Sequence, residues 1–72
     1  MATLLSDIGD FVRAERAVLG WTQREVALYA GVSRKFVVDI EAGKPSLQMD
    51  AVNKVLALFG KRLGLVDIES RR

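Results

Sequence analysis

Hydrophobic residues recur at helical spacing along most of this chain, in segments separated by glycines. The first segment, residues 4–19, places Ile8, Phe11 and Val12 at positions i, i+3 and i+4, on one side of a helix. The last such segment begins near Met49 or Asp50 and ends at Gly60. Its apolar residues, at i, i+3, i+4 and i+7, are Val52, Val55, Leu56 and Phe59. Both patterns predict amphipathic helices that bury one face.

The middle of the chain carries the start and stop signals of two short helices. Residues 22–25 read Thr-Gln-Arg-Glu, a capping box in which Thr22 and Glu25 satisfy each other's backbone amides. That helix is predicted to end before Gly31, because glycine readily adopts the left-handed conformation of a C-terminal cap. A second helix is predicted to follow Ser33, a favourable N-cap, and to run over residues 34–42.

Small and apolar residues indicate a steep crossing of these two short helices. Ala27 offers the small side chain that a close approach of two backbones requires, and Gly31 tolerates the turn between them. The apolar residues that would close the corner are Val26, Ala30, Val32, Val37 and Ile40. The combination predicts a helix-turn-helix within an all-α fold.

The end of the chain has a different pattern, with a two-residue period. Leu63 and Leu65 would lie on one face of an extended segment, and Val66 and Ile68 on the other. This alternation predicts a short β-strand. Because one strand cannot pair its own backbone groups, we expect it to pair with the same strand of a second copy across a two-fold axis. The sequence therefore predicts a homodimer.

Two cations stand where the helix dipole gives them no benefit. Arg34 and Lys35 occupy the first turn of the second short helix, whose N-terminal end carries partial positive charge. They fall, with Val38 and Asp39, on the face opposite Val37 and Ile40. This placement makes sense if the end of the helix points at DNA, where cations reach base edges or phosphates.

The composition narrows the class of protein. A chain of 72 residues allows one domain, and half of its residues are hydrophobic, as in globular proteins. It has no cysteine and no histidine, which excludes disulfides, Cys or His metal sites and histidine-based catalysis. We expect no cofactor and no enzymatic activity. No apolar run reaches the roughly 20 residues that span a bilayer, and the N-terminus does not read as a signal peptide.

The residues Gly-Trp-Thr-Gln-Arg-Glu-Val-Ala-x-x-Ala-Gly-Val-Ser, followed by Ile-Glu-Ala-Gly-Lys, resemble the Cro/C1-type (XRE) helix-turn-helix family. The resemblance covers residues 8–60. It implies a lambda-repressor-like bundle of about four to five helices, with residues 1–60 as the DNA-binding domain and residues 61–72 as dimerisation strand and tail. It also implies a prokaryotic, cytoplasmic repressor, associated with the nucleoid, that binds double-stranded DNA at a palindromic operator.

The resemblance assigns roles to individual residues. It implies phosphate contacts for Gln23, Arg24 and Lys44. The positions that face the groove in this family are Ser33, Arg34, Lys35 and Asp39. The planar fork of Arg34 matches guanine O6 and N7, and Lys35 would read guanine or hold a phosphate. For Asp39 two alternatives remain, a hydrogen bond from cytosine N4 or a pair with Lys35 four residues earlier.

Two further positions match the family in a structural role. Arg16 and Glu41 are expected to form an ion pair that links the first helix to the end of the recognition helix. Trp21 stands where leucine is commoner, and we expect it to be a half-buried lid over the motif. Phe36 is expected to pack beneath the recognition helix more readily than to touch a thymine methyl.

The segment 43–60, followed by a short apolar strand, is similar to the HipB-like branch of antitoxins. This similarity predicts an antitoxin that represses its own operon and binds a HipA-like kinase toxin. The alternatives are a stand-alone phage or chromosomal repressor and a protein–protein adaptor. The adaptor remains an alternative because the positive charge is low for a DNA-binding protein. Residues 22–44 carry four cations against three carboxylates, and the whole chain has a net charge of +2 and a pI of 9.4.

Overall fold

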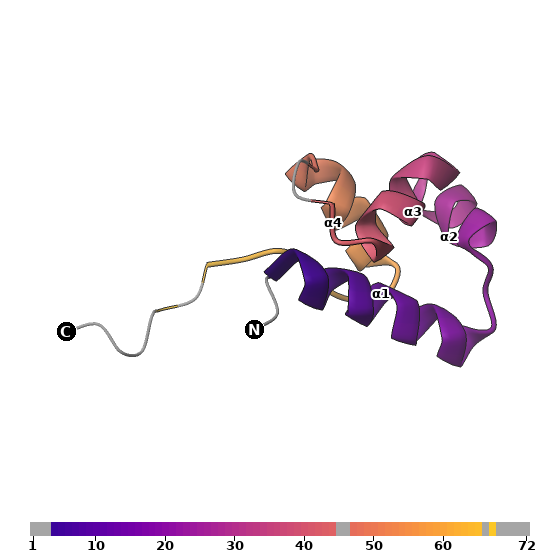
Figure 1. Cartoon of the computed structure of the whole chain (residues 1–72), viewed down its shortest axis with the longest axis horizontal. Helices are drawn as coiled ribbons and strands as arrows, with labels where there is room; N and C mark the ends of the chain where they lie inside the picture. Colours follow the sequence, from indigo (N-terminus) through magenta and orange to yellow (C-terminus); the bar gives the residue numbers. More distant parts are fainter. Residues whose placement is uncertain (1–3, 45–46, 66, 68–72) are drawn as a thin grey trace.

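Four helices form the described part of the chain. The computed structural model describes residues 4–44, 47–65 and 67. Its helices are α1 (Leu4–Leu19), α2 (Gln23–Ala30), α3 (Arg34–Glu41) and α4 (Met49–Ala57) (Figure 1). The predicted helical segments and the predicted helix-turn-helix, formed by α2 and α3, are confirmed.

The helices share one small core. α3 packs against both α1 and α2, and α2 also packs against α4. The buried apolar side chains come from all four helices, and they are Val12, Val26, Ala27, Val37, Ile40, Val52, Val55 and Leu56. Seven of these residues belong to the corner between α2 and α3 or to the apolar stripe of α4, as their spacing predicts. Contacts from α1 and α2 therefore fix the orientation of α3, and α4 supports α2 from another side.

The ends of α2 and α3 have the predicted capping chemistry. The amide of Glu25 donates to Thr22 Oγ1 at 3.0 Å, and the amide of Thr22 donates to Glu25 Oε1 at 2.8 Å. Gly31 adopts the left-handed conformation with φ of 76° and donates to the carbonyl of Ala27. Ser33 Oγ accepts from the amide of Phe36 at 3.0 Å. These local bonds set where each helix of the motif begins or ends.

The C-terminal segment departs from its prediction. α4 ends at Ala57, three residues before the predicted end at Gly60. The amides of Leu58, Phe59 and Gly60 donate to carbonyls three residues earlier, so the backbone tightens there from an α-helix into a turn. Gly60 ends this turn with φ of 73°. The segment then returns to α4, where the amide of Leu63 donates to Asn53 Oδ1 at 2.7 Å. Residues 61–65 and 67 contain no strand, so the predicted β-strand is not seen in this described part of the chain.

The predicted dimerisation residues are only partly described. Leu63 packs against the core and Leu65 is fully exposed, while Val66 and Ile68 lie outside the described residues. Strand pairing between two copies stays a prediction.

The helix α1 approaches α3 most closely at a glycine. A β-carbon added at Gly9 would lie 2.5 Å from the carbonyl oxygen of Ile40 and 3.0 Å from that of Glu41. Both neighbours are backbone atoms at the end of α3, so the helices themselves would have to separate. Gly9 is thus the point at which α1 sits directly on the end of α3.

We expect Gly9→Ala to lower the free energy of unfolding by about 2 kcal/mol, because overpacking outweighs the better helix propensity of alanine. The melting temperature followed by circular dichroism would fall by about 10 °C. Gly64→Ala is the matched control, since nothing lies within 4 Å of the added carbon and Gly64 has no positive φ. Equal melting temperatures for the two variants would contradict this close approach.

Candidate nucleic-acid interface

The first turn of α3 presents its cations outward. Arg34 and Lys35 are exposed, while Val37 and Ile40 are buried on the opposite side of the helix. Phe36 is half-buried and packs against the core, so its predicted packing role is confirmed. The hydroxyl of the N-cap Ser33 accepts a hydrogen bond from the amide of Phe36, so in the free protein this side chain caps α3. α3 thus offers one polar, cationic face to a partner.

A second cationic feature lies at the N-terminus of α2. An open depression of about 660 Å³ is lined by Arg16, Trp21, Thr22, Gln23, Arg24 and Arg34. Among the described residues, Arg24 and Arg34 form no ion pair. This hollow therefore brings together Arg24, a predicted phosphate contact, and Arg34, the predicted guanine contact. Two unpaired guanidinium groups beside the positive end of a helix suit an anion such as a DNA phosphate.

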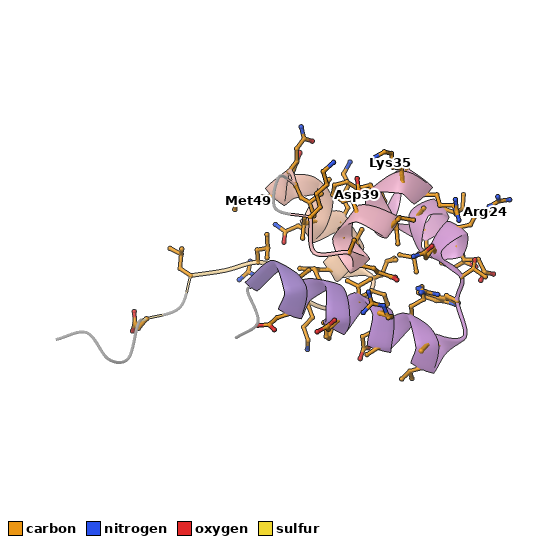
Figure 2. The ribbon with its side chains drawn as sticks, viewed as in Figure 1. Arg24, Lys35, Asp39 and Met49 are labelled. Carbon is orange, nitrogen blue, oxygen red and sulfur yellow. The ribbon has the colours of Figure 1, made fainter. Side chains whose placement is uncertain are left out.

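A carboxylate joins the remaining predicted cations. Lys35 Nζ lies 3.0 Å and Lys44 Nζ 3.6 Å from Asp39 Oδ2. The hydrogen bond from Lys35, reinforced by the charge of Lys44, holds the pKa of the Asp39 carboxyl below its usual value. Figure 2 shows Lys35 and Asp39 together on α3, with Arg24 projecting from α2. The predicted pair of Asp39 with Lys35 is thus present, and a contact with cytosine stays a prediction.

Glu41 forms the structural centre beneath this face. Its side chain is 3% exposed, and Arg16 binds it in bidentate fashion with Nε–Oε2 at 2.8 Å and Nη2–Oε1 at 3.0 Å. The predicted Arg16–Glu41 ion pair is therefore confirmed. Arg13 adds a longer ion pair at 3.8 Å and donates to the backbone carbonyl of Glu41. Burial alone would raise the pKa of this carboxyl, but hydrogen bonds from Arg16 and Gln23 outweigh burial and lower it.

Gln23 has a partner that the sequence does not reveal. Its side-chain amide donates to Glu41 Oε1 at 3.1 Å, which ties the start of α2 to the end of α3. The family resemblance implies a phosphate contact for the same side chain. In the free protein Gln23 supports the ion pair, because a buried carboxylate oxygen is an acceptor that needs a donor.

Three aromatic rings cover the motif from the side. Trp21 is half-buried, and the centroid of its ring lies 4.9 Å from the ring centroid of Tyr29 and 6.2 Å from that of Phe59. The predicted lid is therefore present. It links the loop before α2 to the end of α4, and this packing steadies the N-terminus of α2.

The comparisons with known proteins agree with this geometry. A family model for the helix-turn-helix matches residues 12–66. The chain belongs to the Cro/C1-type (XRE) helix-turn-helix family. A protein of Sinorhizobium fredii (strain NBRC 101917 / NGR234), described as an uncharacterized HTH-type transcriptional regulator, y4mF, is 40% identical over 67 residues. The alignment covers 93% of this chain and 88% of that relative. No solved structure matches.

Membership of the helix-turn-helix family identifies a DNA-binding regulator. Its candidate DNA-binding residues form two groups and a cap: Gln23, Arg24 and Arg34 at the hollow beside α2, Lys35, Asp39 and Lys44 along and just after α3, and Ser33 at the N-cap of α3. Arg34 and Lys35 are adjacent in the chain, so the two groups meet at the first turn of α3. None of the helices in the described ranges is both long and apolar enough to span a bilayer.

Proposed function

We propose that this helix-turn-helix protein is a sequence-specific transcriptional repressor that inserts the N-terminal turn of α3 into the major groove. The observation that supports this most directly is the exposure of Arg34 and Lys35 on the first turn of α3, where the helix dipole disfavours cations. The unfavourable interaction of these cations with the helix dipole is offset when the end of the helix faces the negative charge of DNA. Arg24 beside Arg34 would then hold the adjacent phosphate.

The proposed active form is a homodimer. Leu65 is fully exposed, Met49 is 67% exposed, and both line an apolar groove with Leu63 and Val52. Pairing of residues 63–68 with their copies would cover this surface and supply the missing strand partners. Two copies of α3 would then read a palindrome whose half-sites lie about 34 Å apart, one turn of DNA, or a multiple of that spacing.

Selection of binding sites from random duplex DNA tests the proposal. We expect a palindrome bound with a dissociation constant of about 10⁻⁸ M or lower. The affinity should fall steeply with salt, because the protein's lysines and arginines release counterions from the phosphates when they bind. A protein–protein adaptor on the same fold would select no sequence and would show no such salt dependence. That result would reject the repressor and favour the adaptor.

We expect Arg34→Ala to weaken binding to the selected site by about 1–3 kcal/mol and to relax the preference at one base pair of each half-site. The reason is that a bidentate contact to guanine carries sequence information, whereas a phosphate contact does not. Fluorescence anisotropy titrations with the selected duplex and with single-base variants of it measure both effects.

Arg62→Ala is the matched control for Arg34→Ala, since Arg62 is an exposed arginine in the segment after α4. It should leave the base preference unchanged. If Arg34→Ala instead weakens binding to every sequence by the same factor, Arg34 is a phosphate contact.

An antitoxin role is a finer proposal that rests on the resemblance of residues 43–60 to HipB-like proteins. The relative from Sinorhizobium fredii is described only as a transcriptional regulator. We expect a HipA-like kinase toxin to dock on the folded dimer or on residues 69–72. Co-purification from a strain that carries the neighbouring genes tests this, and recovery of the dimer alone would favour a stand-alone repressor.

A further inference from the structure

A carboxylate occupies the middle of the surface that we assign to DNA. Asp39 accepts from Lys35 at 3.0 Å and lies 3.6 Å from Lys44. The side chain of Asp39 is 22% exposed, whereas those of Lys35 and Lys44 are 78% and 48% exposed. The carboxylate is the better-anchored member of the group, and the two lysines reach it from the solvent side.

The fold places Lys44 at this carboxylate. Ordinary pairing along a helix surface accounts for Lys35, which lies one turn before Asp39. It does not account for Lys44, which follows the end of α3. There, Gly43 turns the chain with φ of 74°, and the amide of Lys44 donates to the backbone carbonyl of Asp39 at 3.1 Å. The turn therefore directs a second cation back to the same carboxylate.

We propose that Asp39 is a specificity-determining residue that withholds Lys35 and Lys44 from DNA phosphates until a base amino group, best matched by cytosine N4, takes their place. This inference rests on the proposed function. On a sequence without an amino group at that position, the carboxylate stays paired with the two lysines and keeps them from the phosphates. On the matching sequence, cytosine N4 donates to Asp39, and both lysines become free to bind phosphates.

The charges give the proposal a quantitative consequence. Lys35, Asp39 and Lys44 together carry a net charge of +1, and asparagine in place of Asp39 would raise it to +2. Because each neutralised phosphate contributes about −0.9 to the slope of log affinity against log salt, the slope on random DNA should steepen by about 0.9. At about 0.1 M salt, that change corresponds to roughly tenfold tighter binding to random duplex.

The experiment compares Asp39→Asn with wild type on random duplex and on the selected site. We expect roughly tenfold tighter binding and a steeper salt slope on random DNA, with a much smaller gain on the selected site. Site selection with the variant should lose the cytosine preference at one base pair per half-site. Asp7→Asn is the matched control, because Asp7 is an exposed carboxylate in the first turn of α1 that forms no ion pair with Lys35 or Lys44. It should change neither the slope nor the preference.

Two results would overturn the proposal. Equal tightening on random and selected duplexes, with base preference unchanged, would make Asp39 a repulsive charge without a role in specificity. No change on either duplex would show that Asp39 does not withhold the lysines. Failure of the proposed function looks different, since wild type itself would then bind no duplex with a salt-dependent affinity.

A double-mutant cycle tests whether Asp39 acts through the two lysines. In a Lys35→Gln/Lys44→Gln background, we expect Asp39→Asn to change the affinity for random duplex no more than Asp7→Asn does. A full tenfold effect in that background would also overturn the proposal, because the carboxylate would then act on DNA without the lysines. Circular dichroism melting curves establish that each variant is folded before it is titrated.

Discussion

Replacing Arg16 with alanine is expected to lower the free energy of unfolding by about 3 kcal/mol at pH 7. The substitution removes the bidentate partner of Glu41, whose side chain is 3% exposed, and leaves a buried charge with weaker partners. A chain of this size has a total free energy of unfolding of roughly 4–11 kcal/mol, so the loss is a large fraction of it. Urea denaturation followed by circular dichroism measures the change.

Arg13→Ala is the control for Arg16→Ala, because both arginines lie on α1 and point to Glu41. The side chain of Arg13 is 50% exposed and its ion pair with Glu41 is 3.8 Å long, so we expect a loss below about 1 kcal/mol. Equal losses for the two variants would show that the bidentate pair is not the source of the stability.

The same pair predicts how stability depends on pH. Since the pKa of Glu41 is lowered in the folded protein, its contribution is complete above the unfolded pKa of about 4.3 and is lost as the pH falls through the folded value. The stability difference between wild type and Arg16→Ala should therefore narrow on acidification below about pH 4. A difference that stays constant down to pH 3 would contradict this assignment.

The helices of the motif were predictable because their signals are local. Thr22 and Glu25 cap each other within one turn, Gly31 is the left-handed residue, and Ser33 caps the next helix. None of these bonds spans more than a few residues, so the sequence alone contains both partners. The end of α4 was placed three residues too late, because the tightened turn before Gly60 keeps the apolar spacing of a helix.

The features that the sequence does not show are contacts between distant residues. By helix propensity, Gly9 is an unfavourable residue inside α1. The reason for a glycine there is that the carbonyls of Ile40 and Glu41 leave no room for a β-carbon, and the sequence does not show this contact. Gln23 likewise acquires its partner Glu41 from another helix. The Asp39–Lys44 contact depends on the turn at Gly43. The sequence signal for this contact is Gly43, a glycine that directly follows the predicted helix end and precedes a cation.

We expect Leu65→Pro to abolish the proposed dimer and to weaken operator binding by about 10²-fold or more. Proline removes a backbone donor from the predicted strand at residues 63–68, and a strand with a missing bond pairs poorly with its copy. Each subunit would then bind its half-site alone and lose the gain from linking two sites. Sedimentation equilibrium measures the dimer, and anisotropy with the selected palindrome measures the affinity.

The folded subunit should survive this substitution, because Leu65 is fully exposed while Leu63 holds the segment to α4 through Asn53 and the core. Leu65→Ala keeps the amide and is the matched control, so it should retain more of the dimer than Leu65→Pro. A Leu65→Pro variant that remains dimeric would place the interface elsewhere on the molecule. A monomeric variant that keeps the wild-type base preference on a half-site would separate recognition by α3 from the dimerisation that makes recognition strong.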